Sequence, residues 1–222
     1  MVIGGFLSKK CVLPSGGEWE SAFSDEATES WTQQCSGREV WAPIVAVVGE
    51  RLLRVHAFID ESKRGEYALC AVTVAAGDLT ALRRQMNALR PPGHTRIHMT
   101  GVGKKLAPKI VSDVARLEAT SRIYLMSSRK VNERQARDAT LAAAVRDLTQ
   151  MPVTNLVIES CDQDHEDNRI IRGELGGAAP FRYTHDRPSN PLLWIPDVHA
   201  WAWGRGGSMR AKIAHRITVV RV

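Results

Sequence analysis

Short apolar segments alternate with amphipathic segments along most of this chain, and that alternation restricts the fold more than any other feature. Two apolar runs, Leu52–Ile59 and Tyr67–Ala75, are separated by a turn-like Lys-Arg-Gly sequence and predict a β-hairpin. Two later runs, Arg122–Met126 and Asn155–Ile158, have the length and composition of buried strands. Segments with helical periodicity stand between them. We therefore predict an α/β domain in which a mixed sheet carries helices on its faces.

The predicted helices show apolar residues at intervals of three and four, and some of them end before Pro or Gly. Phe181–Thr184 is predicted to be an edge strand, and the polar segment Ser160–Asn168 to be a loop. The predicted helices span Asp78–Arg90, Lys105–Ala119, Asn132–Gln150, Arg169–Leu175 and Val198–Trp203.

The first fifty residues differ in composition from the rest of the chain. They are rich in Gly, Ser and Glu and lack sustained periodicity, so we predict that residues 1–50 form a poorly ordered or accessory extension and residues 51–222 the α/β domain. The extension holds three Lys/Arg and seven Asp/Glu, whereas the remaining residues hold 27 Lys/Arg and 17 Asp/Glu. The net positive charge therefore lies in the predicted domain, where it favours polyanionic partners, nucleic acid first.

Membrane proteins and zinc knuckles are disfavoured by the sequence. No apolar run approaches the roughly 18–20 residues that cross a bilayer, and the first two lysines follow the apolar start of the chain instead of preceding it as in a signal peptide. We expect a cytoplasmic protein with no membrane partner. The cysteines contain no C-x-x-C pair, so we expect free thiols at Cys11, Cys35, Cys70 and Cys161.

Acidic residues follow apolar runs directly at three places. Asp60 and Glu61 end the first run, Glu159 ends the run at 155–158, and Asp197 opens the last predicted helix. In an α/β sheet such positions gather along one rim, where ligands bind. Like charges that meet there repel one another unless a cation lies between them, and carboxylate oxygens suit Mg²⁺ or Mn²⁺. Two such ions can activate a water for hydrolysis of a phosphodiester.

Each of these acids also has a purely structural interpretation. Asp60 and Glu61 are common turn residues, and Asp197 after a proline is favourable in a first helical turn because of the helix dipole. Further acids crowd positions 162–167, where Asp162 or Asp167 could complete the site or simply begin a helix. The same run lacks the glycine and the glutamate that an EF-hand loop requires, so an EF-hand is excluded.

The strings HAFIDES, YALCAVTV, IHMTG, NLVIES and LLWIPDVHAWAW, in this order, resemble the family called domain of unknown function 3800 over about residues 54–205. The resemblance implies a ribonuclease H-like mixed β-sheet flanked by helices, in a family thought to contain nucleases. It implies that Asp60 is the central metal ligand, Glu159 the acid of the second strand and Asp197 the last acid. The chain departs from the family in having Glu159 where Asp is more usual, which lengthens a ligand arm, and Pro196 where a small residue is usual.

Residues outside the three acids are candidates for accessory roles. His98 stands in the IHMTG string where the family often has histidine, and it either orients water or phosphate or is an ordinary surface loop residue. Several Lys and Arg residues could form a basic surface that binds along a phosphate backbone, and a solvated helix surface explains them nearly as well. These basic residues are Lys104, Lys105, Lys109, Arg129 and Lys130.

The sequence thus predicts a metal-dependent nuclease of RNA or DNA in which Asp60, Glu159 and Asp197 hold Mg²⁺ or Mn²⁺ and His98 assists. The alternative is a catalytically silent module on the same fold that binds nucleic acid or a protein partner. A toxin or defence component that needs a neighbouring protein is a third possibility. Salt-dependent binding without turnover distinguishes the silent module from the nuclease.

Overall fold

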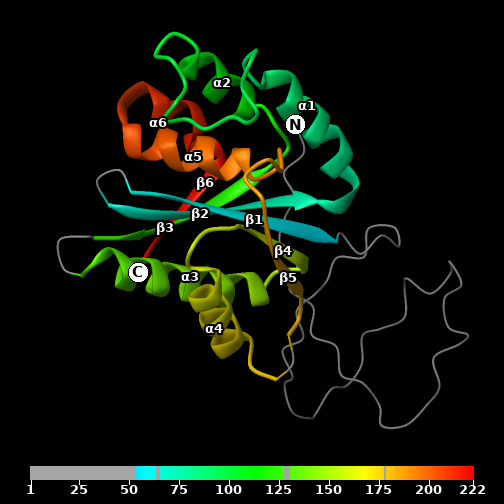
Figure 1. Ribbon diagram of the computed structural model, residues 1–222, viewed down its shortest axis with the longest axis vertical. Coiled ribbons are helices and arrows are strands. Elements are labelled where there is room, and N and C mark those ends of the chain that lie inside the picture. The colour runs from blue at the N-terminus through cyan, green and yellow to red at the C-terminus, as the bar shows by residue number, and fades with distance from the viewer. Residues whose placement is uncertain (1–53, 64–65, 128–130, 178) are drawn as a thin grey trace, which may run out of the picture. The chain divides into compact units, whose positions relative to one another are not determined.

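The computed structural model describes residues 54–63, 66–127, 131–177 and 179–222 (Figure 1). The predicted extension at 1–50 lies outside these residues, and so do the predicted nucleic-acid contacts Arg129 and Lys130. None of the helices in the described part of the chain is both long and apolar enough to cross a bilayer.

Six strands form one mixed sheet in the order β5-β4-β1-β2-β3-β6. β1 and β2 form the predicted antiparallel hairpin, and β3 pairs antiparallel with β2. β4 runs parallel to β1, β5 parallel to β4, and β6 parallel to β3. The strands are β1 (Val55–Ser62), β2 (Tyr67–Ala75), β3 (Thr120–Met126), β4 (Val153–Glu159), β5 (Arg182–Asp186) and β6 (Ile217–Arg221).

Helices cover both faces of this sheet, as the sequence predicts. In Figure 1, α1, α2, α5 and α6 lie above the sheet, and α3 and α4 lie below it. We call these the α5 face and the α3 face. The helices are α1 (Leu79–Leu89), α2 (Ala107–Val114), α3 (Glu133–Thr149), α4 (Asp164–Leu175), α5 (Trp194–Arg205) and α6 (Gly207–Ile213), with short 3-10 turns at Ala76–Asp78 and Ala214–Arg216.

Alternation along the strands divides the buried side chains into two cores. Phe58 of β1 and Val157 of β4 belong to the core under α5, whereas Ile59 and Ile158 belong to the core over α3. Successive side chains of a strand point to opposite faces. Side chains two residues beyond Phe58 and Val157 therefore point to the α5 face, and Glu61, two residues beyond Ile59, points to the α3 face.

Three of the element boundaries that differ from the prediction lie beside acidic residues. β1 continues through its acidic residues to Ser62. α4 begins at Asp164, inside the segment predicted as a loop, because acids in a first turn interact favourably with the helix dipole. α5 begins at Trp194, so that Pro196 and Asp197 both lie in its first turn, where proline needs no N–H partner.

His199 of α5 is buried in the core, and its pH dependence should be visible in the stability of the protein. Its Nδ1 lies 2.6 Å from Ser121 Oγ. Burial, with Arg216 and His215 nearby, lowers the pKa of His199 from 6.5 to about 4. The unfolded chain therefore binds the extra proton between these pH values, and about 3 kcal/mol of stability is lost as the pH falls from 6.5 to 4.

His199→Gln removes this titration, so its Tm should fall less than that of the wild type between neutral pH and pH 4. The measurement is a series of thermal melts across that range. His94→Gln, at an exposed position, is the matched control and should follow the wild type. Parallel Tm curves for His199→Gln and the wild type would contradict the assignment.

Candidate functional site

Asp60, Glu159 and Asp197 meet on the α5 face of the sheet. β1 and β4 pair in parallel register through Ile59 and Ile158, so Asp60 and Glu159, one residue further on, lie side by side. α5 packs on β1 and brings Asp197 to the same face. The charges of Glu159 and Asp197 both act on Asp60, which gives the three acids one shared electrostatic environment.

Negative charge accumulates at this position beyond what the nearby donors compensate. Burial, followed by the charges of Glu159 and Asp197, raises the pKa of Asp60 well above its usual range, even though the N–H of Glu61 donates to Asp60 Oδ1 at 2.7 Å. Burial also raises the pKa of Glu159, although Arg96 Nη1 lies 3.4 Å from Glu159 Oε1. A bound cation would relieve this repulsion.

The IHMTG loop closes the site from the side of α5. Asp197 Oδ2 accepts a hydrogen bond from the N–H of Met99 at 2.9 Å and lies 3.5 Å from His98 Nδ1. The contact with Asp197 raises the pKa of His98, whose Nε2 lies 2.6 Å from Thr100 Oγ1. The structure therefore places His98 against the last of the three acids, half-exposed to solvent.

The donor chemistry fits a hard cation, but the three acids do not converge on a single point. Among the described residues, the group of three whose ligand atoms all lie within 4.8 Å of one another is a different one, on the α3 face. Glu159 instead reaches toward Arg96. An ion held by all three acids therefore requires side-chain movement, and the long, half-buried Glu159 has the most freedom to move. Three carboxylates supply the hard oxygen donors that Mg²⁺ and Mn²⁺ prefer.

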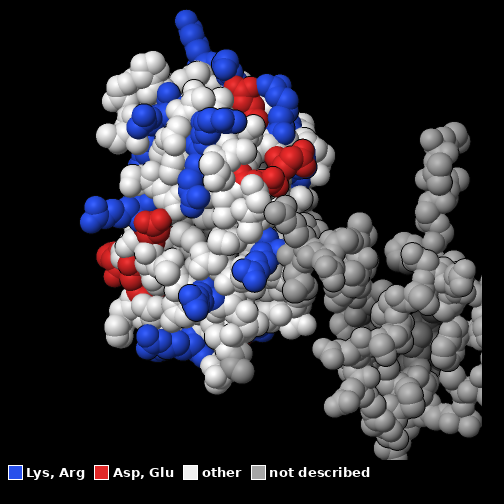
Figure 2. Space-filling view, turned by 90° about the vertical axis from the view of Figure 1, so that its right-hand side faces the viewer, with Lys and Arg blue, Asp and Glu red and all other residues white. Residues whose placement is uncertain are grey.

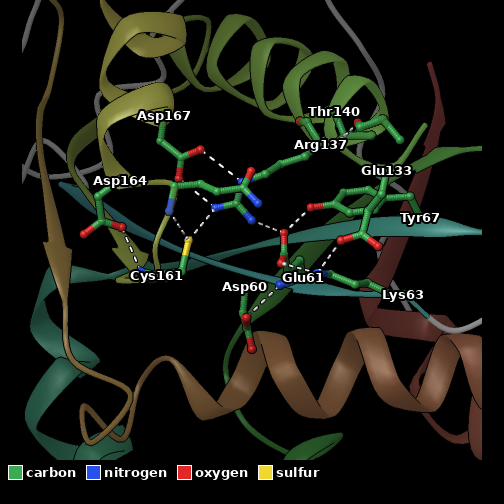
Figure 3. A network of polar contacts seen from close by, with 12 residues as sticks. Asp60, Glu61, Lys63, Tyr67, Glu133, Arg137, Thr140, Cys161, Asp164 and Asp167 are labelled. Carbon is green, nitrogen blue, oxygen red and sulfur yellow. Dashed lines mark hydrogen bonds and ion pairs between the residues drawn. The ribbon is translucent and has the colours of Figure 1, made fainter. Parts of the chain in front are cut away.

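Glu61, predicted as a possible additional ligand, points to the opposite face from Asp60 (Figure 3). Tyr67 OH and Arg137 Nη1 both donate to Glu61 Oε2, and Lys63 Nζ lies 3.7 Å from Glu61 Oε1. Both carboxylate oxygens are thus already engaged. Glu61 is better suited to hold the end of β1, including the N–H that binds Asp60, than to bind an ion beside it.

Asp167, the other predicted addition, also lies on the α3 face and is paired with arginine. Its carboxylate is buried and accepts hydrogen bonds from Arg137 Nε at 3.1 Å and Nη2 at 2.7 Å. This fork-shaped pairing engages both oxygens, so Asp167 is held toward Arg137 on the α3 face and does not point to the three acids. Asp162, the alternative addition, is exposed two residues before the start of α4.

A cavity of about 70 Å³ lies at the ends of β1 and β4. Asp60 and Glu159 line it together with Glu61, Arg137 and Asp167. A water needs roughly 10–15 Å³ of cavity volume. The cavity therefore has room for a few waters between the Asp60–Glu159 pair and the Arg137–Asp167 pair.

The predicted nucleic-acid contacts before and within α2 lie on the surface. Lys104 and Lys105 are exposed, whereas Lys109 is paired with Asp113, with 3.0 Å between Lys109 Nζ and Asp113 Oδ2. On the face seen in Figure 2, Lys and Arg side chains are scattered and do not merge into a continuous surface. Binding of a polyanion to this face would therefore rest on local groups of basic side chains.

Comparison with known proteins gives low similarity to solved structures. No family model and no curated protein matches the chain. A ribonuclease H2 from Pyrococcus horikoshii OT3 is similar at 12% identity and a TM-score of 0.49, over 66% of this chain and 70% of that one. The ribonuclease HII of a complex with PCNA from Archaeoglobus fulgidus has 16% identity and a TM-score of 0.45, over 72% and 78%. A mutant of Bst-RNase HIII has 11% identity and a TM-score of 0.41, over 67% of this chain and 51% of that one.

The fold of this chain is assigned from the order and directions of its own strands. Three antiparallel strands, β1 to β3, are extended beside β1 by the parallel strands β4 and β5, and helices cover both faces. The domain has a ribonuclease H-like α/β fold, as the sequence predicts.

Proposed function

We propose that this chain is a divalent-metal-dependent nuclease that hydrolyses phosphodiester bonds of RNA or DNA. The observation that carries the proposal is the meeting of Asp60, Glu159 and Asp197 on one face, where burial and then the charges of the other two acids raise the pKa of Asp60. We further propose that the chain belongs with the domain of unknown function 3800 and that it is cytoplasmic. The resemblance of its motifs supports the family, and its composition supports the location.

Asp60, Glu159 and Asp197 would hold Mg²⁺ or Mn²⁺, which when bound stabilises charge on the phosphate and lowers the pKa of water. The N–H groups of Glu61 and Met99 fix Asp60 and Asp197. Glu159 completes the ligand set by turning away from Arg96, and this frees the Arg96 guanidinium to contact a phosphate oxygen.

His98 is placed to orient the attacking water or to hold a proton. Its Nδ1 faces Asp197 Oδ2 at 3.5 Å, and its side chain is about half exposed, so substrate can reach it. The contact with Asp197 raises the pKa of His98, so the charged imidazolium, which attracts a phosphate, persists to higher pH than in a free histidine.

The proposal is tested by incubating the purified full chain with single-stranded and double-stranded RNA and DNA and with an RNA–DNA hybrid. Cleavage of at least one substrate with Mn²⁺ or Mg²⁺, its loss on chelation with EDTA and its return on adding Mn²⁺ are the expected results. If nothing in the panel is cleaved and binding is nevertheless salt-dependent, the domain is the catalytically silent module.

The role of Lys104 and Lys105 is tested through the salt dependence of binding. Each phosphate contact that is lost reduces the slope of log K against log salt by about 1, so the Lys104→Ala, Lys105→Ala double variant should reduce it by about 2. Fluorescence anisotropy with a labelled oligonucleotide and EDTA measures this without turnover. Lys109→Ala is the control with a smaller expected effect, because Lys109 Nζ already lies 3.0 Å from Asp113 Oδ2. If Lys109→Ala reduced the slope as much per lysine as the double variant does, the proposed role of Lys104 and Lys105 would be contradicted.

A further inference from the structure

Four side chains with metal-binding atoms meet where the end of β4, the start of α4 and β5 come together. Cys161, Asp164 and Asp167 each offer a ligand atom, and these three atoms lie within 4.8 Å of one another. His185 Nε2 lies 3.9 Å from Asp164 Oδ1 and 3.7 Å from Asp167 Oδ2. We propose that these four side chains form a second metal site, for a Zn²⁺-like ion, with ligands distinct from the three acids of the proposed nuclease.

This group lies on the other face of the sheet from Asp60. β5 pairs with β4 so that His185 lies beside Ile158, whose side chain belongs to the core over α3. His185 therefore points to the α3 face, where α4 supplies Asp164 and Asp167. In Figure 3, Cys161, Asp164 and Asp167 lie close together, and Asp60 points away from them.

The distances between the ligand atoms and the kinds of donor atom both suit Zn²⁺, which accepts sulfur, nitrogen and oxygen ligands. Bonds of about 2.0–2.3 Å in a tetrahedral Zn²⁺ site put neighbouring ligand atoms about 3.3–3.7 Å apart. The distances from His185 Nε2 to the two carboxylates are already within a few tenths of an ångström of this range. A mixed set of thiolate, imidazole and carboxylate is typical of Zn²⁺, whereas the oxygen-only set on the α5 face is typical of Mg²⁺.

His185 provides an observation that is independent of the acids and the cysteine. Its Nε2 is buried, its side chain is only 12% exposed, and within the described residues this atom has no hydrogen-bond partner. A buried polar atom without a partner is costly, and the two nearest carboxylates are too far away for a hydrogen bond. An ion between His185 and these carboxylates would satisfy the nitrogen.

Arg137 fits this site as an outer partner of the ligands. Its Nη2 donates to Cys161 Sγ at 3.2 Å and to Asp167 Oδ2 at 2.7 Å, and its Nε donates to Asp167 Oδ1. A thiolate and two carboxylates carry three negative charges, which Arg137 and a divalent ion would balance. Asp164 is also oriented, by the N–H of Cys161 at 2.8 Å and by Ser160 Oγ at 2.6 Å. Such outer contacts are the usual support of metal ligands.

The test is a Co²⁺ titration of the full chain, because a cysteine thiolate bound to Co²⁺ gives a charge-transfer absorption that oxygen ligands do not give. The titration uses a Cys11→Ser, Cys35→Ser background, which leaves Cys161 and the core residue Cys70. We expect the absorption to saturate at one equivalent and to disappear on adding Zn²⁺. Cys161→Ser should abolish it, and His185→Gln should weaken Co²⁺ binding at least about 10-fold.

Asp60→Asn is the matched control for the other face. It should leave the Co²⁺ absorption unchanged, so failure of the nuclease proposal and failure of this site are distinguishable. Absence of the absorption, or its persistence in Cys161→Ser, would overturn the site. If Cys161→Ser does not fold, as judged by circular dichroism, His185→Gln decides alone: unchanged affinity for Co²⁺ would overturn the proposal.

Discussion

Asp60→Asn is expected to lower metal-dependent cleavage more than about 100-fold and to raise the Tm of the metal-free protein by a few degrees. The loss of activity should exceed the 10–100-fold typical of losing a partner of a metal ligand, because Asp60 is proposed as the central ligand itself. The gain in stability follows from burial and repulsion: burial, then the charges of Glu159 and Asp197, disfavours a charged Asp60, and asparagine cannot carry that charge. Its Oδ1 can still accept the hydrogen bond from Glu61.

The measurements are single-turnover cleavage with Mn²⁺ and thermal melts with EDTA or with excess Mn²⁺. Mn²⁺ should raise the Tm of the wild type and have little effect on Asp60→Asn, since only the wild type has the full ligand set. Asp78→Asn makes the same chemical change at an exposed acid with no side-chain capping bond and should change neither quantity. A lower Tm for metal-free Asp60→Asn, or full activity, would contradict the proposed role.

Arg137→Met is expected to destabilise the protein by about 3–5 kcal/mol, the usual cost of leaving buried charges without a partner. Arg137 is almost fully buried, and it binds the buried carboxylate of Asp167 through two hydrogen bonds and Glu61 through another. Methionine fills similar volume but neutralises neither acid. For a domain of this size, such a loss lowers the Tm by about 6–20 °C.

Arg146→Met is the matched control for this effect. Arg146 stands on the same helix and pairs with Glu174 at 2.9 Å, but its side chain is 59% exposed, so the expected loss is less than about 1 kcal/mol. Adding Asp167→Asn to Arg137→Met should recover part of the lost stability, because one of the unpaired charges is then removed. Chemical denaturation measures all three differences. Similar losses for Arg137→Met and Arg146→Met would show that burial does not set the strength of the pair.

Much of the fold could be predicted because strand and helix periodicities are local properties. Two adjacent apolar runs predict the hairpin of β1 and β2. That Asp60 lies beside Glu159 follows once β1 and β4 are taken as parallel neighbours. The face to which each acid points was harder. Glu61 and Asp60 are equally acidic in the sequence, and only the packing of α3 and α5 on opposite faces separates their roles.

The arginine and histidine partners of the acids could not be predicted. Arg137 sits in an Ala-rich helix with several charged residues, and nothing in the local pattern distinguishes it from the solvent-exposed Arg134. Arg96 meets Glu159 across 63 residues, and Asp167 meets Arg137 across 30. His185 lies in a polar edge strand whose pattern is weak. These contacts depend on strand order and helix docking, which no single segment encodes.

One peptide bond connects the two faces of the sheet. The N–H that holds Asp60 on one face belongs to Glu61, whose carboxylate is held by Arg137 on the other. Arg137 therefore supports a hydrogen-bond donor of Asp60 through a single residue of backbone. Any free-energy coupling between the two faces would pass through Glu61 and shift affinity equally in both directions, without removing a ligand from either site.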